Sequence, residues 1–171
     1  LQKVKLITLS RLVKWKNIDK LIKAVSDLKY VKLYIIGNGP EENYLNELVS
    51  KSKNRNIKFY NNLSREECLD YLEKSDCFVQ ISSYEGMSFS VLESMKLGKA
   101  MILSSIDPNF ETAKNSAIYI NPYSIKEIKS SIEIIRFNKI RSNLQNNSIK
   151  NSNKYYSKEK SLQKYLDFLL N

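Results

Sequence analysis

Residues 77–98 read C-F-V-Q-I-S-S-Y-E-G-M-S-F-S-V-L-E-S-M-K-L-G, an apolar run followed by a polar loop and then by apolar residues at helical spacing. The run Cys77 to Ile81 predicts a buried strand, and the helical pattern closes at Gly98, a favoured residue just past a helix end. Glu85 then lies in the loop. Glu93 lies in the second helical turn, with its side chain leaning toward the start of the helix. We expect both carboxylates to face one opening.

The pattern on either side of this unit alternates strands with helices. Further strands are predicted at 4–10, 31–36, 57–60, 101–103 and 118–120, and helices at 18–28, after the turn 37–40, at 64–72 and from Ser124 onward. Strands separated by helices predict an α/β fold, a Rossmann-like parallel sheet with helices on both faces.

We expect residues 1–154 to form this domain and residues 155–171 to form a C-terminal amphipathic helix. That helix either packs on its own domain, which we favour, or crosses to a missing N-terminal domain.

Composition narrows the chemistry. The 171 residues include no histidine, which removes the commonest general base and metal ligand, and no paired aspartates that suit a divalent metal. Cys68 and Cys77 lack zinc-site spacing and are predicted to be core residues. No apolar stretch reaches the roughly 18 to 20 residues of a membrane span, so we expect a cytoplasmic protein. The formal charge of +10 favours anionic partners without choosing among them.

The candidate functional groups all follow predicted strands. Arg11 and Lys16 come after the first strand, Gly37 and Gly39 after the second, Asn61 and Asn62 after the third, and Glu85 after the fourth. Ligands of parallel sheets bind at this carboxyl edge, and a helix N-terminus there suits a phosphate. Carboxylates beside it would hold hydroxyls, so the pattern suits a nucleotide diphosphate sugar. Gly37, Gly39 and Gly86 are also predicted as turn glycines with positive φ.

Several motifs together resemble the donor-binding half of a GT-B glycosyltransferase of the retaining family four, the glycosyl transferases group 1. They are S-R-L-V-K-W-K-N (10–17), I-I-G-N-G-P (35–40), F-Y-N-N-L-S (59–64), S-S-Y-E-G-M-S-F-S-V-L-E-S-M (82–95), G-K (98–99), Glu111 and Asn121-Pro122. Ser10, Asn17, Asn61 and Ser88 depart from it, because the family often has glycine there. Ser88 and Asn61 are expected to narrow the space beside the phosphates and the base.

The resemblance implies a role for each site residue. Arg11 and Lys16 would stabilise charge on the departing diphosphate, and Glu85 would hold hydroxyls of the transferred sugar. Glu93 would accept the ribose hydroxyls. The remaining donor-binding positions are Gly86, Ser88, Phe89, Ser90, Asn62 and Leu63, the last two beside the base. Neither a metal nor a cofactor is implied.

We therefore expect a metal-independent, retaining hexosyltransferase domain of surface polysaccharide synthesis, with a glycan or lipid-linked acceptor. The chain would be a fragment that binds donor weakly and does not catalyse transfer, from a protein that associates peripherally with the inner face of the cell membrane. One alternative is a non-enzymatic nucleotide- or nucleic-acid-binding module on the same sheet. Another is a degenerate structural domain, against which the intact set Arg11, Lys16, Glu85 and Glu93 argues.

Overall fold

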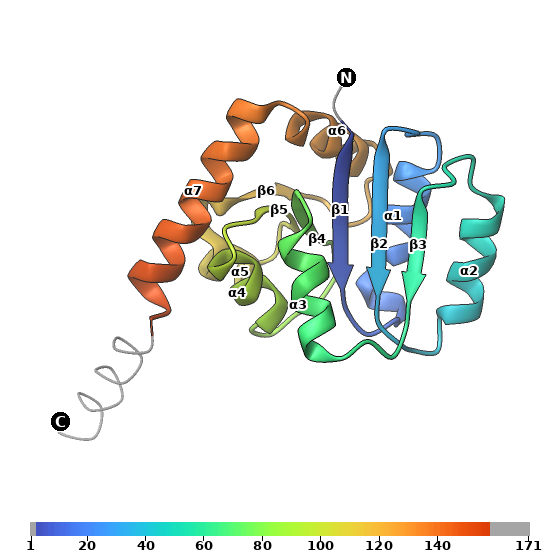
Figure 1. Cartoon of the computed structure of the whole chain (residues 1–171), viewed down its shortest axis with the longest axis horizontal. Coiled ribbons are helices and arrows are strands. Elements are labelled where there is room, and N and C mark those ends of the chain that lie inside the picture. The colour runs from blue at the N-terminus through green and yellow to red at the C-terminus, as the bar shows by residue number, and fades with distance from the viewer. Residues whose placement is uncertain (1–2, 158–171) are drawn as a thin grey trace.

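The computed structural model describes residues 3–157, which form a parallel sheet between two layers of helices (Figure 1). The six strands lie in the order β3-β2-β1-β4-β5-β6, and all neighbours are parallel. They are β1 Val4–Leu9, β2 Val31–Ile36, β3 Ile57–Tyr60, β4 Cys77–Gln80, β5 Ala100–Ser104 and β6 Ala117–Ile120. This confirms the predicted α/β class and Rossmann-like sheet. The strand order reverses between β1 and β4, where such sheets bind ligands.

The helices cover both faces of the sheet because its strands are apolar on both. Leu6 and Ile7, neighbours in β1, belong to different core clusters, as expected for strands whose side chains alternate between faces. The helices are α1 Ile18–Val25, α2 Glu42–Lys51, α3 Arg65–Glu73, α4 Phe89–Lys96, α5 Asp107–Ala113, α6 Ile125–Ile135 and α7 Asn138–Tyr155, with 3-10 turns η1 Lys14–Lys16 and η2 Lys114–Ser116. Helices α1, α2 and α6 pack on one cluster, and α3, α4 and α5 on the other.

Helix α7 packs against α4, η2 and β5. The Ser148 hydroxyl donates a 2.6 Å hydrogen bond to the carbonyl of Lys99, just before β5. Because α7 ends at Tyr155, it spans the predicted boundary between residues 154 and 155. The rest of the predicted C-terminal helix, residues 158–171, lies outside the described residues and stays a prediction. Within residues 3–157, no helix has both the length and the apolar character needed to cross a bilayer.

One helix prediction needs correction, and one helix was not predicted. The helix predicted at 18–28 ends at Val25, because the chain turns there. The Leu28 amide donates a hydrogen bond to the Val25 carbonyl, and β2 begins at Val31. Helix α5 was not predicted. It has only seven residues, starts with an Asp-Pro pair and leaves Phe110 largely exposed, so it shows no helical apolar stripe.

The glycines after β2 allow two loops to approach closely. A Cβ on Gly37 would lie 1.9 Å from the Ser10 carbonyl oxygen, and one on Gly39 would lie 2.3 Å from that of Leu12. Gly37 has a φ of +149°, as predicted, but Gly39 and Gly86 do not have positive φ, so that prediction was wrong for both. Gly39 is needed for close approach alone. The loops after β1 and β2 therefore lie in direct backbone contact.

Candidate functional site

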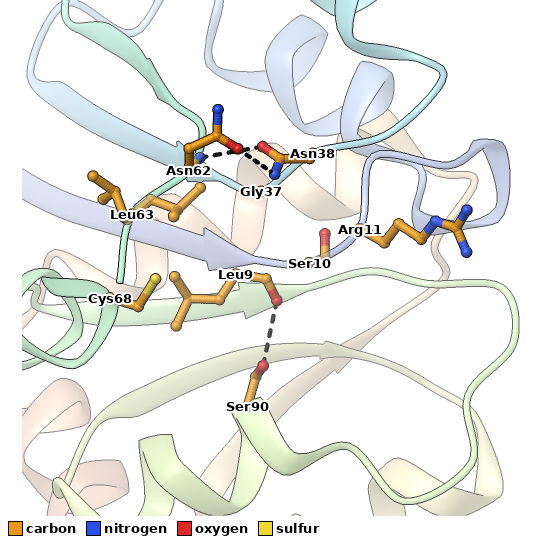
Figure 2. A pocket seen from close by; sticks show the side chains of 10 residues that line it. Leu9, Ser10, Arg11, Gly37, Asn38, Asn62, Leu63, Cys68 and Ser90 are labelled. Carbon is orange, nitrogen blue, oxygen red and sulfur yellow. Dashed lines mark hydrogen bonds between the residues drawn. The ribbon is translucent and has the colours of Figure 1, made fainter. Parts of the chain in front are cut away.

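A cavity of about 410 Å³ opens where β1, β2 and β3 end, beside the start of α4 (Figure 2). A neighbouring hollow of about 350 Å³ shares Leu9, Leu63, Cys68 and Ser90 with it. We call the two together the strand-end groove. Its lining residues are Leu9, Ser10, Arg11, Ile36, Gly37, Asn38, Asn62, Leu63, Arg65, Cys68, Leu69, Ser90 and Glu93. The groove therefore brings together Arg11, Asn62, Leu63, Ser90 and Glu93 from the predicted set.

The start of α4 presents open amides to this groove. The Ser88 hydroxyl caps the helix by accepting from the Val91 amide and donates a 2.8 Å hydrogen bond to Gln80 Oε1. The Ser90 hydroxyl donates to the Leu9 carbonyl at 3.4 Å, which holds this first turn against the end of β1 (Figure 2). No acceptor within residues 3–157 pairs with the amides of residues 89 and 90. A helix N-terminus with free amides favours an anion.

Arg11 supplies a cation at the rim of the groove. It lies two residues after the end of β1, is exposed, and its side chain extends away from the centre of the cavity (Figure 2). Its guanidinium has no hydrogen-bond or ion-pair partner in the part of the chain that the structure describes. An Arg with unused donors at the rim of a cavity can offer a planar fork to a phosphate once its side chain turns inward.

Paired asparagines form the wall on the β2 and β3 side. Asn62 has a φ of +56°, a conformation that asparagine tolerates better than most residues. The Asn38 side-chain amide donates a 2.9 Å hydrogen bond to Asn62 Oδ1, and the Asn62 backbone amide donates to Asn38 Oδ1 at 3.3 Å (Figure 2). The loops after β2 and β3 are thus joined beside Leu63.

Two departures from the family pattern, Asn61 and Ser88, do not line the strand-end groove. Asn61 donates its side-chain amide to Glu42 Oε1 at 2.8 Å, so it is directed toward α2. Ser88 uses its hydroxyl to cap α4 and to contact Gln80. Both side chains are already engaged in the fold, and the expected narrowing beside the phosphates and the base stays a prediction.

Lys16 and Glu85 form an ion pair outside the groove. The distance from Lys16 Nζ to Glu85 Oε1 is 2.5 Å, and the two side chains are only 16% and 11% exposed. Asn17, at a φ of +53°, holds the loop of Lys16 against the loop of Glu85. Its side-chain amide donates to the Ile81 carbonyl at 2.9 Å and to the Ser83 hydroxyl at 2.8 Å. Asparagine stands here in place of the family's usual glycine and ties the loop after β1 to the loop after β4.

The expectation that Glu85 and Glu93 face one opening was wrong in this structure. Glu85 lines a separate hollow of about 380 Å³ next to residues 105–108, whereas Glu93 lies in the strand-end groove and pairs with Arg65. The cause is local: the loop carrying Glu85 is drawn to Lys16, and α4 starts between the two acids. Gly86 has no atom within 4 Å of an added Cβ, and Phe89 is 75% exposed, so both lie on the surface and line neither hollow.

Sequence reasoning missed four residues of this region. They are Asn17, which joins the loops after β1 and β4, and Asn38, Arg65 and Cys68. Arg65 lies inside a confirmed capping box from Ser64 to Glu67, and no sequence signal links it to Glu93. Burial raises the pKa of the Cys68 thiol, which therefore stays neutral at physiological pH and forms a small apolar wall. Asn38 was read only as part of a glycine turn.

The sequence profile of the family described as glycosyl transferases group 1 matches residues 1–155. An uncharacterized glycosyltransferase of Methanocaldococcus jannaschii is 29% identical over 95% of this chain and 44% of its own length. An O-antigen biosynthesis glycosyltransferase of Escherichia coli, WclY, is 29% identical over 76% of this chain and 36% of its own length. The chain thus spans less than half the length of these curated relatives.

Solved structures show the same fold. Anabaena HepE in complex with UDP superposes with a TM-score of 0.88 at 17% identity, over 98% of this chain and 49% of that one. A mutant of Staphylococcus aureus TarM, in complex with fondaparinux, alpha-GlcNAc-glycerol and UDP, gives 0.84 at 22% identity, over 98% of this chain and 36% of that one. The family match favours a transferase over the nucleic-acid-binding alternative. The chain belongs to the glycosyl transferases group 1 family and forms a Rossmann-like domain of the GT-B type.

Proposed function

We propose that the strand-end groove binds the nucleotide diphosphate of a nucleotide-sugar donor and that the domain serves a hexosyltransferase. One observation carries the proposal: the two adjoining hollows of the strand-end groove combine Arg11, which has no partner among residues 3–157, the open first-turn amides of α4 and the carboxylate of Glu93. An anion site flanked by a hydroxyl acceptor matches a diphosphate joined to a ribose. Relatives solved with UDP share the fold and support this choice.

The groove suggests where each part of the donor lies. The diphosphate would accept hydrogen bonds from the amides of residues 89 and 90 and from Arg11. Glu93, which already accepts one bond from Arg65, would accept the ribose hydroxyls with its remaining capacity. Asn62 and Leu63 would flank the base. The buried Ser10 hydroxyl lines the same groove without a partner among residues 3–157 and would gain one from the donor.

The pair Lys16–Glu85 would act on the transferred sugar. Glu85, which is 11% exposed and paired with Lys16, would accept hydrogen bonds from sugar hydroxyls, while the Lys16 ammonium would stabilise negative charge on the departing phosphate. These cations, with the α4 terminus, would stabilise the leaving group without a metal. Retention of the anomeric configuration is proposed from the family resemblance.

The acceptor and the setting are further parts of the proposal. The relatives are more than twice as long as the span they share with this chain, so we propose that a second domain binds a glycan or lipid-linked acceptor. Surface polysaccharide synthesis is proposed from the O-antigen relative. The formal charge of +10 would favour peripheral association with an anionic inner membrane face.

Calorimetric titration of the chain with UDP, GDP, ADP and their sugars tests the proposal. We expect saturable binding of one nucleotide class that weakens about tenfold or more in Arg11→Ala and in Glu93→Ala, because each removes a charge-assisted hydrogen bond. Arg55→Ala and Glu47→Ala are matched controls, since both residues are exposed and lie outside the groove. No binding at millimolar ligand, or binding that both groove variants leave unchanged, would contradict the proposal. Glycosyl transfer by the chain alone would contradict the need for a second domain.

A further inference from the structure

A larger hollow, of about 690 Å³, opens at the same edge of the sheet and shares no lining residue with the strand-end groove. We call it the aromatic hollow. It is built from η1, the starts of α1 and α2 and the loops after β4 and β6, and three aromatic side chains line it, Trp15, Tyr44 and Tyr123. Its volume falls in the range of roughly 300 to 1,000 Å³ that small ligands occupy.

These three rings are exposed although most large apolar side chains of the domain are buried. Trp15 is 51% exposed, Tyr44 44% and Tyr123 62%. They come from three separate segments of the chain, so local sequence does not explain why they gather around one hollow. Rings at such a site offer broad apolar faces with polar edges, which suits a ligand that has both C–H faces and hydroxyls. A sugar ring has this character.

The charges of the hollow are balanced, in contrast to the basic chain as a whole. Lys14 and Lys20 are matched by Asp19 and Glu41. Lys20 lies over the Tyr123 ring, 5.7 Å from its centroid, and 3.6 Å from an Asp19 oxygen. The Glu41 carboxylate and the Lys14 ammonium have no partner within the described part of the chain. A free acceptor and a free donor around a neutral site select hydroxyls over a polyanion.

The aromatic hollow adjoins the ion pair at the proposed transfer site. Trp15 precedes Lys16, whose Nζ is 2.5 Å from Glu85, and the Trp15 carbonyl accepts a 2.8 Å hydrogen bond from the Ser83 amide. We propose that the hollow binds neutral saccharide units of an acceptor glycan that also contacts the proposed second domain, next to the unit that receives the new sugar. This inference rests on the proposed function, because the transfer site defines which glycan is meant.

Trp15 is the single tryptophan of the chain, so its fluorescence reports directly on the hollow. The experiment titrates the chain with maltotriose, cellotriose and chitotriose at millimolar concentrations. We expect a saturable change in Trp15 emission with at least one of them. Tyr123→Ala and Glu41→Gln should raise the half-saturating concentration about three- to tenfold, by loss of a ring face and of a charged acceptor.

Two matched controls leave the hollow intact: Phe137→Ala removes another exposed ring, and Glu47→Gln changes another carboxylate of the α2 region. The inference would be overturned by no saturable response to any trisaccharide, or by responses equal in all variants. It would also be overturned if emission changed with protein concentration alone, since a second copy would then cover the hollow. Calorimetry with UDP on the same samples separates the two claims, because failure of the hollow leaves UDP binding intact.

Discussion

The two edges of the sheet differ in how completely the fold uses their polar groups. At the amino edge, the buried Asn54 donates its side-chain amide to the carbonyls of Val25, Leu28 and Val31 at 3.2, 3.0 and 3.0 Å. Also at that edge, the Lys99 ammonium donates to the carbonyls before β4. Both side chains thus satisfy backbone carbonyls at or just before the starts of the strands.

The carboxyl edge is left incomplete. Ser10 Oγ, Gln80 Nε2 and Ser82 Oγ are buried there without partners among the described residues, and the amides at the start of α4 are open as well. The other buried side-chain atoms without partners among these residues, Arg136 Nε and Nη2, belong to a guanidinium that pairs with Glu133 and lies over the Tyr30 ring beside the start of β2. Buried polar groups without partners cost free energy, and three of the four residues that carry them lie at the carboxyl edge together with the open amides, so a ligand is expected there. The amino edge serves stability and the carboxyl edge serves binding.

The largest effect is expected from Asn54→Ala. It leaves three carbonyls at the amino edge without their shared donor, so the free energy of unfolding should fall by about 2–4 kcal/mol. Denaturant unfolding measures this loss. Asn56→Ala, an exposed neighbour with one side-chain bond to Lys29, is the control and should cost less than about 1 kcal/mol. Equal losses in the two variants would contradict the assigned role of Asn54.

Gly37→Ala should cost about 2–3 kcal/mol and also weaken donor binding. The added Cβ would lie 1.9 Å from the Ser10 carbonyl oxygen, at a φ of +149°, so the floor of the groove must shift. Unfolding and calorimetry together check this. Gly86→Ala is the matched control, because its Cβ meets open space. It should keep stability within about 0.5 kcal/mol, and a larger loss would refute the description of the loop.

Burial of Lys99 at the amino edge should make the free energy of unfolding depend on pH. Burial lowers the pKa of the Lys99 ammonium below its usual value of 10.5, so the unfolded chain binds more protons between the lowered value and 10.5. The free energy of unfolding should therefore rise with pH through that window relative to Lys99→Met. Unfolding curves across the alkaline range check the difference in slope. Lys96→Met, an exposed neighbour, should keep the wild-type slope, and loss of the slope in that variant as well would count against burial as its cause.

The smallest effect is expected for Arg65→Ala. The Arg65 side chain is 74% exposed, and exposed ion pairs contribute about 0 to 1 kcal/mol, so nucleotide affinity should stay within about fivefold of wild type. Calorimetry beside Glu93→Ala measures the contrast. A loss as large as that of Glu93→Ala would show that Arg65 itself contacts the donor, and would move the centre of recognition from α4 to α3.

The sequence predicted the sheet well and the side-chain geometry less well. Apolar runs and glycine turns located all six strands to within a few residues, because burial on both faces leaves a continuous apolar signal. Pairings between distant segments carry no such signal. The bond from Asn17 to the loop after β4 and the contact of Arg65 with Glu93 depend on tertiary packing, and the same packing separates Glu85 from Glu93.

The central claim is that the carboxyl edge, and not the amino edge, holds the nucleotide diphosphate. Backbone amide NMR spectra of the chain, recorded during titration with the nucleotide selected by calorimetry, test it most directly. We predict saturable shifts concentrated at Arg11, Asn62, Phe89 and Ser90, with Asn54 and Lys99 unchanged. Shifts centred on Asn54 and Lys99, or no shifts at saturating nucleotide, would contradict the account.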